Sequence, residues 1–197
     1  AIAISTMGAL FYNVLPLFVG TVQDSLDLSN SKVGVLTSVF FLGFNIVAAS
    51  AFFWIRKINW RTVALISTLV GIGGLALSGL TDNYALLLFA IFLAGGAFSS
   101  IYGLGTTVLG DTSNPARWYG AKIAAEASVG AFLLFILPIT LIASYGFPGL
   151  VSGMIAATIL LACFIGFLPA SGAKSTETTT VATAGTHPFT IWVSLFA

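Results

Sequence analysis

Residues 33–55 read VGVLTSVFFLGFNIVAASAFFWI, and residues 56–61 read RKINWR. The first stretch carries no charged side chain, and its length matches the roughly 20 residues that an α-helix needs to cross a bilayer core of about 30 Å. The second stretch brings three basic side chains together directly after it. An apolar run closed by a basic cluster is typical of a transmembrane helix that ends at the cytoplasmic surface. These residues therefore predict an all-α membrane protein.

The composition of the whole chain agrees with this interpretation. Of the 197 residues, 58% are hydrophobic and only 7% are charged, whereas an ordinary soluble domain carries about 25% charged residues. So few charges exclude a water-soluble protein and make membrane lipid the expected surrounding. The formal net charge of +1 and the sparse Lys and Arg also exclude a nucleic-acid partner.

Polar turns divide the rest of the chain into runs of similar length. The predicted spans are 1–23, 33–55, 62–80, 84–108 and two spans between 118 and 168. The last two are separated by the turn residues Tyr145-Gly146-Phe147-Pro148-Gly149. We therefore expect one six-helix transmembrane bundle over residues 1–169.

The sequence changes character after this bundle. Residues 170–188 are rich in Ser, Thr, Ala and Gly, which is the composition of a flexible linker. Residues 189–197 are apolar again and are predicted to begin a seventh transmembrane helix. The alternative for these nine residues is a short amphipathic tail that lies on the membrane surface.

The basic residues near the ends of the spans predict the orientation. Lys32 is the single basic residue on one side of an alternating six-span arrangement. The residues on the other side are Arg56, Lys57, Arg61, Arg117, Lys122 and Lys174. We therefore expect this second side, together with the N-terminus and the linker, to be cytoplasmic in a plasma or cell inner membrane.

Six spans, a basic loop after the second span and a polar linker before a seventh together resemble the N-terminal half of a major facilitator superfamily transporter. The family's basic loop motif corresponds to residues 51–61, AFFWIRKINWR, where Lys57 and Arg61 keep its basic character. Arg56 stands at the acidic position of the motif and Asn59 at a glycine position. The resemblance implies two inverted three-helix repeats and secondary transport by alternating access, with a small solute held between two bundles. It also implies that the C-terminal half is missing here and that these residues alone do not transport.

The resemblance further implies that the first and fourth spans line a central cavity. Asn13 could hold the solute through its amide, and Pro16 frees a backbone carbonyl and permits a bend. Alternatively, Asn13 and Asn45 hydrogen-bond between helices as packing contacts, which contributes about 1 kcal/mol. The candidates for lining the cavity are Tyr12, Asn13, Asn45, Ser99, Ser100 and Tyr102.

Small residues form a ridge on the predicted fourth span. Gly95, Ser99 and Gly103 follow one another at intervals of four residues, and Gly96 and Ser100 form the neighbouring row. Such a ridge is typical of a face where a second helix approaches closely. The alternative is that it opens room in a cavity, where the two serines would supply hydrogen bonds.

Glu126 is the most notable charge of the chain. Counted from Trp118 at the membrane edge, it lies about 12 Å along its helix, within the hydrocarbon zone. A carboxylate at this depth must face protein or water, and it could carry the coupling proton. Lys122 lies one helical turn away, so a structural ion pair between the two residues is the alternative.

The predicted inner loops could form a cytoplasmic gate. Asp111 is followed closely by Arg117, and an ion pair at this end of span four could belong to the gate. Ordinary loop charges are the alternative. The candidates for this gate are Arg56, Lys57, Arg61, Asp111 and Arg117.

An enzymatic function is not expected. The spans contain no His and only the single cysteine Cys163, and they hold no paired carboxylates. An intramembrane hydrolase would need such groups as a base or as metal ligands, so we expect neither a cofactor nor a metal site. Besides transport of an unidentified solute, driven by an ion or a proton, the alternative function is a non-transporting six-span scaffold or sensor subunit.

Overall fold

The computed structural model describes residues 1–171, and the chain is helical throughout this part, with no strand. The α-helices are α1 Ile2–Asn13, α2 Leu15–Leu26, α3 Asn30–Trp54, α4 Trp60–Leu80, α5 Tyr84–Gly110, α6 Pro115–Leu137 and α7 Ala143–Ala162. A π-helical turn, Pro138–Ile142, joins α6 to α7, and a 3₁₀ turn, Ile165–Phe167, follows α7. The all-helical prediction is confirmed for these residues. The predicted seventh helix and most of the linker lie outside them.

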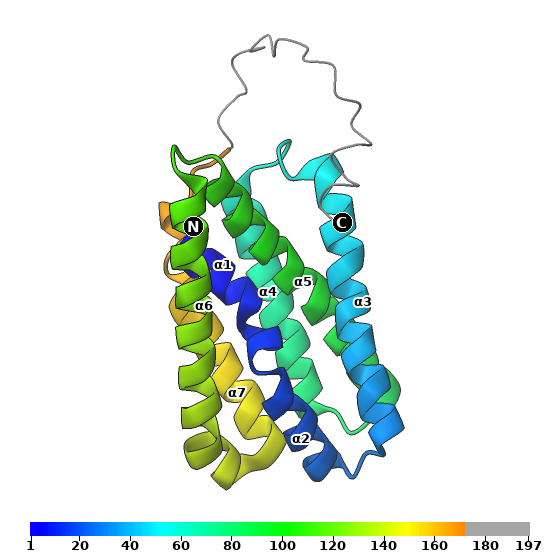
Figure 1. The fold of residues 1–197 in the computed structure, drawn as a ribbon. Coiled ribbons are helices and arrows are strands. Elements are labelled where there is room, and N and C mark those ends of the chain that lie inside the picture. The colour runs from blue at the N-terminus through cyan, green and yellow to red at the C-terminus, as the bar shows by residue number, and fades with distance from the viewer. Residues whose placement is uncertain (172–197) are drawn as a thin grey trace, which may run out of the picture.

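Four continuous helical runs are long and apolar enough to cross a membrane, and the bent pair α1 and α2 would make a fifth span. One of these runs is the 53-residue stretch Pro115–Phe167, which folds back on itself so that α6 and α7 lie antiparallel (Figure 1). Large apolar side chains such as Phe52, Phe135 and Leu160 are exposed on the outer surface. This surface is compatible with an integral membrane protein, because water would disfavour so much exposed apolar area.

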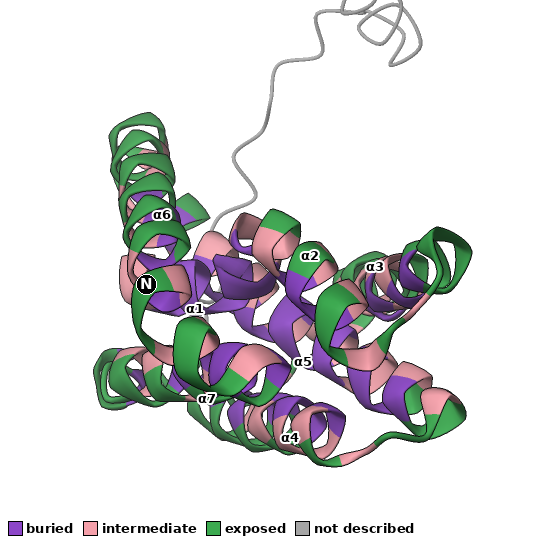
Figure 2. Cartoon of the chain, turned by 90° about the horizontal axis from the view of Figure 1, so that it is seen from below, coloured by how far each residue is buried: buried purple, intermediate pink, exposed green. Residues whose placement is uncertain are grey.

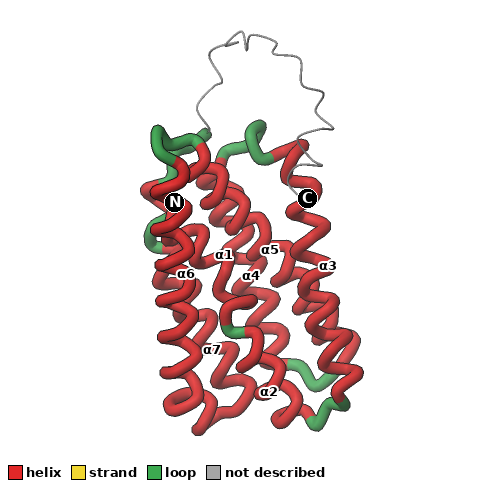
Figure 3. Tube along the Cα trace, viewed as in Figure 1, coloured by secondary structure: helices red, strands yellow, loops and turns green. Residues whose placement is uncertain are grey.

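Asparagine side chains cap the N-termini of three of the long helices. Asn59 accepts hydrogen bonds from the first backbone N–H groups of α4, Asn83 from those of α5, and Asn114 from that of Arg117 in α6. Ser29 caps α3 in the same way. Each cap satisfies N–H groups that have no partner within the helix. Short loops can therefore separate the helices, as the tube in Figure 3 makes visible.

The chain reverses at Gly146, where the sequence predicts a break. Gly146 has a φ of +57°, which an L-residue rarely adopts. The next N–H group, that of Phe147, donates to Ser25 Oγ at 3.0 Å. The break at Gly146, which lies within the bounds of α7, is therefore fastened to the end of α2.

The centre of the bundle is formed by α1 and α5, with the other helices around them (Figure 2). Eight successive residues of α1, from Ile4 to Phe11, are buried. The Phe11 ring stacks on Phe40 of α3 with ring centroids 3.9 Å apart. The small-residue ridge of α5 faces α3, since a Cβ on Gly95 would meet the backbone of Phe40.

Two boundaries differ from the predicted spans. The first span is not one helix, because α1 and α2 meet at Val14 with an angle of 44°. Pro16 has no N–H to donate into the preceding turn, which explains the break. The α-helical part of the last span ends at Ala162, and a 3₁₀ turn follows that ends at Phe167, one residue before the predicted end at Leu168. The carbonyls of Leu168 and Ala170 instead accept hydrogen bonds from Arg61 Nε and the Trp60 N–H at the start of α4.

Candidate functional site

A buried ion pair lies about half-way along α6. Lys122 Nζ is 3.1 Å from Glu126 Oε1, and the two side chains are only 4% and 10% exposed. The four-residue spacing puts both side chains on the face of α6 that turns toward α1. Charges so far from water require partners, because an uncompensated charge in a low-dielectric interior is strongly unfavourable.

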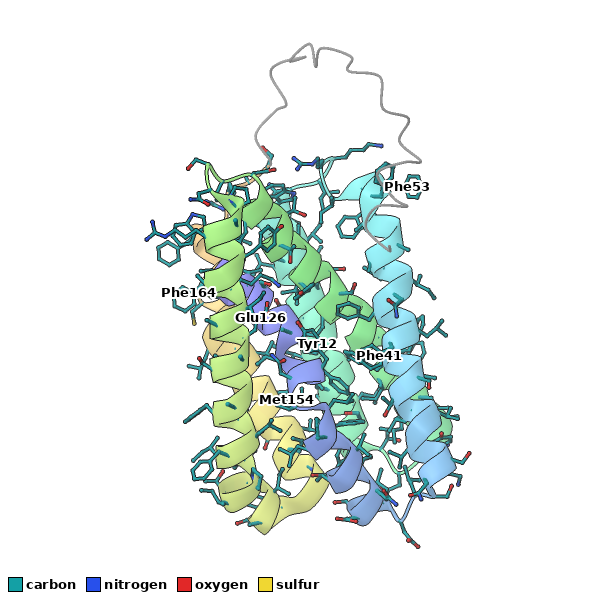
Figure 4. The ribbon with its side chains drawn as sticks, in the orientation of Figure 1. Tyr12, Phe41, Phe53, Glu126, Met154 and Phe164 are labelled. Carbon is teal, nitrogen blue, oxygen red and sulfur yellow. The ribbon has the colours of Figure 1, made fainter. Side chains whose placement is uncertain are left out.

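The helix α1 supplies two of these partners and a third contact to the backbone of Glu126. Ser5 Oγ donates to Glu126 Oε1 at 2.7 Å, and Tyr12 OH donates to Glu126 Oε2 at 3.4 Å. Asn13 Nδ2 donates to the backbone carbonyl of Glu126 at 3.2 Å. Figure 4 shows Tyr12 of α1 and Glu126 of α6 near each other in the middle part of the bundle.

Tyr102 of α5 is the partner of Lys122 on the other side. Lys122 Nζ donates to Tyr102 OH at 2.7 Å and lies 4.2 Å from the centre of its ring. The ring of Tyr12 meets that of Tyr102 edge-on, with centroids 6.0 Å apart. We call the six residues from these three helices the polar cluster: Ser5, Tyr12, Asn13, Tyr102, Lys122 and Glu126.

Glycines bring the three helices close enough for these contacts. A Cβ on Gly8 of α1 would collide with the backbone of Tyr102, and a Cβ on Gly105 of α5 would collide with the backbone of Ser5. Gly130 of α6 makes room for the Asn13 side chain in the same way. Small residues at helix crossings allow such close approach in membranes. The glycines therefore determine which polar side chains meet.

A cavity of about 300 Å³ adjoins the polar cluster between α3 and α5. Tyr102 belongs to both, since it also lines the cavity together with Phe44, Trp54 and other residues. Ser99 and Thr106 are also among the lining residues, and their hydroxyl oxygens are buried without a hydrogen-bond partner. A ligand in the cavity would reach these oxygens only after their side chains turn toward it.

Two of the predicted cavity residues lie elsewhere. Asn45 Nδ2 donates to the Phe41 carbonyl of its own helix, and its side chain is exposed. Ser100 Oγ donates to the Gly96 carbonyl within α5 and lines a different pocket, toward α4. The structure therefore brings Tyr12, Asn13 and Tyr102 to the polar cluster, and Ser99 to the adjoining cavity.

The predicted gate residues gather at one end of the bundle, which we call the basic end. Arg56 Nη2 lies 2.8 Å from Asp111 Oδ1 and forms an ion pair that joins the ends of α3 and α5. Asp111 thus pairs with Arg56, whereas the sequence suggested Arg117 beside it. The hydrogen bonds that Arg56 donates to Asp111, and the charge of that carboxylate, raise the pKa of Arg56. Lys57 and Arg117 are exposed.

Ser5 is the member of the polar cluster that our sequence analysis missed. Ser5, Tyr12 and Asn13 are seven and eight residues apart, which puts them on one face of a helix. This periodicity is a signal in the sequence, although a lone serine near a chain end carries little weight. Its partner Glu126 is 121 positions away and follows only from the three-dimensional arrangement.

The polar cluster can hold one proton or a small polar ligand. A carboxylate that accepts from Ser5 and Tyr12 can take up a proton without losing its neighbours, because both hydroxyls also accept hydrogen bonds. Within residues 1–171, no three His, Cys, Asp or Glu residues lie close enough to hold a metal ion.

A scan against protein-family models finds no matching family, and a search of curated proteins finds no relative of this chain.

Proposed function

We propose that this chain forms one six-helix bundle of a secondary transporter, which moves a small solute across a membrane by alternating access. The observation that carries this proposal is the polar cluster, which includes a lysine and a glutamate buried half-way along the bundle. Ionisable groups at this depth are costly, and in membrane proteins they mark substrate, ion or proton pathways. A scaffold would need only apolar helices and could omit them.

The helix packing supports two inverted repeats. We compare the first unit, α1 with α2, α3 and α4, with the second unit, α5, α6 and α7. If the two units are exchanged, α3 corresponds to α6 and α5 corresponds to α1. The contact of α3 with α5 then corresponds to the contact of α6 with α1. In the same exchange, the contact of α4 with α5 corresponds to the contacts of α7 with α1 and α2. Units of three spans have opposite orientations in the membrane, as in many secondary transporters.

The crossing of α1 and α5 supports the same relation at the residue level. Gly8 of α1 lies against the backbone of Tyr102, and Gly105 of α5 lies against the backbone of Ser5. In each helix, a glycine thus packs against the backbone of a polar residue in the other helix. In inverted-repeat transporters, the solute site lies near the midplane. The polar cluster lies at this crossing.

The resemblance to the major facilitator superfamily fits these features and belongs to the proposal. It adds a second six-helix bundle, which would close the solute site from the other side. The basic end holds Arg56, Lys57, Arg61 and Arg117, so we assign it to the cytoplasm of the plasma or cell inner membrane.

Uptake by proteoliposomes tests the proposal. The full-length protein should accumulate a solute, found by a metabolite screen, when a proton gradient is applied, and residues 1–197 alone should not. In Glu126→Gln, accumulation should be lost while exchange of solute across the membrane persists, because exchange needs no net proton movement. Asp24→Asn, an exposed carboxylate near the end of α2, is the matched control. A full-length protein that exchanges no solute at all would favour the scaffold.

A further inference from the structure

The polar cluster is electrically balanced before any ligand enters. Lys122 contributes one positive and Glu126 one negative charge, and the other members are neutral. The titratable groups that face the pair are Tyr12 from α1 and Tyr102 from α5. Within residues 1–171, α3 and α7 bring no titratable side chain to it. The two charges of α6 therefore determine the electrostatics of the site.

Lys122 has a donor left for a ligand. Its ammonium group carries three N–H donors, and the structure shows hydrogen bonds or ion contacts to Tyr102 OH and Glu126 Oε1. Tyr102, the acceptor of one of them, also lines the cavity of about 300 Å³. Lys122 does not line this cavity itself, so an anionic group would reach its ammonium group only past the Tyr102 side chain.

The lining of the cavity indicates what the rest of the ligand is like. Phe44, Ala48 and Trp54 offer apolar and aromatic surface, which suits a carbon skeleton better than a hydrated inorganic anion. Ser99 is only 3% exposed, and its hydroxyl lacks a partner. Ser99, Tyr102 and Thr106 lie on one face of α5, since they are three and four residues apart. A hydroxyl or keto oxygen of a ligand would satisfy the buried Ser99 and Thr106 hydroxyls once their side chains turn toward the cavity.

On these grounds, and resting on the proposed function, we propose that the polar cluster binds the carboxylate of a small hydroxy or keto monocarboxylate at Lys122, and that one proton enters Glu126 with each anion. The physical reason is charge balance. A second negative charge beside Glu126 would be strongly repelled at low dielectric, whereas a proton taken from solution onto the Glu126 carboxylate restores neutrality. The same step couples the movement of one anion to that of one proton.

Calorimetric titration of the full-length protein in detergent tests this proposal. The probes are lactate, 4-hydroxybutyrate and mandelate, with mandelamide as the neutral counterpart of mandelate and phosphate as an inorganic anion. Titrations in two buffers of different ionisation enthalpy give the number of protons taken up per ligand. We expect at least one carboxylate to bind with uptake of about one proton, and its affinity to rise about tenfold for each pH unit of acidification. Mandelamide and phosphate should bind at least tenfold more weakly than that carboxylate.

Variants assign the two roles. Glu126→Gln keeps the size of the side chain and should bind the carboxylate without proton uptake and without dependence on pH. The double variant Lys122→Met/Glu126→Gln leaves no unpaired charge and should lose binding at least tenfold. Lys32→Met removes an exposed lysine at the opposite end of the bundle and should bind as the natural protein does.

Several results would overturn the proposal: no carboxylate binds, mandelamide binds as tightly as mandelate, phosphate is preferred, or the natural protein binds without taking up a proton. These results differ from a failure of the proposed function. A protein that binds carboxylates with proton uptake but moves no solute in proteoliposomes would refute transport alone. A protein that accumulates a neutral solute and ignores carboxylates would refute only the proposed substrate class.

Discussion

At the scale of single residues, Glu126 depends on Lys122 for its stability in the folded protein. The Glu126 side chain is 10% exposed, and Lys122 supplies the positive charge of the polar cluster at 3.1 Å. Removing one partner of a buried ion pair leaves a charge without compensation, which typically costs about 3–5 kcal/mol. Replacing both partners with neutral groups can cost little.

This asymmetry gives a first prediction. Lys122→Met should lower the free energy of unfolding by about 3 kcal/mol or more, and Lys122→Met/Glu126→Gln should recover most of the loss. Thermal denaturation in detergent, together with the yield of monodisperse protein, measures both effects. If the double variant is as unstable as Lys122→Met, the loss comes from packing of the lysine stem and not from an unpaired carboxylate.

The ion pair at the basic end should behave differently. Arg56 is 59% exposed in its contact with Asp111, and exposed pairs contribute about 1 kcal/mol or less. We predict that Asp111→Asn lowers the unfolding free energy by no more than this, and that added salt reduces the difference. The raised pKa of Arg56 means that its stabilising effect is present at neutral pH, where Asp111 is a carboxylate, and is lost only when the pH rises through that high value. Stability near neutral pH should therefore not depend on titration of Arg56.

At the scale of helices, two adjacent glycines of α4 offer a matched comparison. A Cβ on Gly74 would come within 2.7 Å of the Ala90 carbonyl oxygen in α5, whereas a Cβ on Gly73 would meet nothing within 4 Å. Gly74→Ala should destabilise the bundle by about 1–3 kcal/mol because the helices must move apart. Gly73→Ala should be neutral or slightly stabilising, since alanine favours helix. Equal melting temperatures for the two variants would show that α4 and α5 do not pack closely.

The sequence predicted the helical elements well because uncharged runs and polar turns determine where helices in a membrane can begin and end. It predicted the turn around Gly146 and the proximity of Lys122 to Glu126, which is a property of one helix. It did not predict the break at Val14 as the end of a helix. Nor did it predict that α7 gives way to a 3₁₀ turn after Ala162, or that Leu168 and Ala170 then accept hydrogen bonds from the start of α4.

The site was predictable only in part, for a related reason. Tyr12, Asn13 and Tyr102 stand out as polar residues in apolar runs, but so does Asn45, which bonds only within its own helix. The crossing angles and the glycine contacts decide which of them meet Glu126. These depend on pairs of residues more than 90 positions apart, such as Gly8 and Tyr102, and no periodicity within one helix reports them.

At the scale of the whole molecule, the two ends of the bundle should face opposite sides of the membrane. Asp82 lies in the loop between α4 and α5, and Ser113 lies in the loop between α5 and α6 at the basic end. In a background with Cys163→Ser, Asp82→Cys should react with a membrane-impermeant maleimide added to intact cells. Ser113→Cys should react only after permeabilisation. The reverse labelling pattern would invert the proposed orientation.

The bend at Val14 connects the polar cluster to the break at Gly146 through α2. Before this bend, Tyr12 and Asn13 donate hydrogen bonds to Glu126. After it, α2 extends for about 18 Å. Near its far end, Ser25 accepts a hydrogen bond from the Phe147 N–H. A swing of about 10° at Val14 would carry that end through about 3 Å. A small strain at the C-terminal end of α1 would thus become a larger displacement of the Gly146–Phe147 break, at the end of the bundle opposite the basic end.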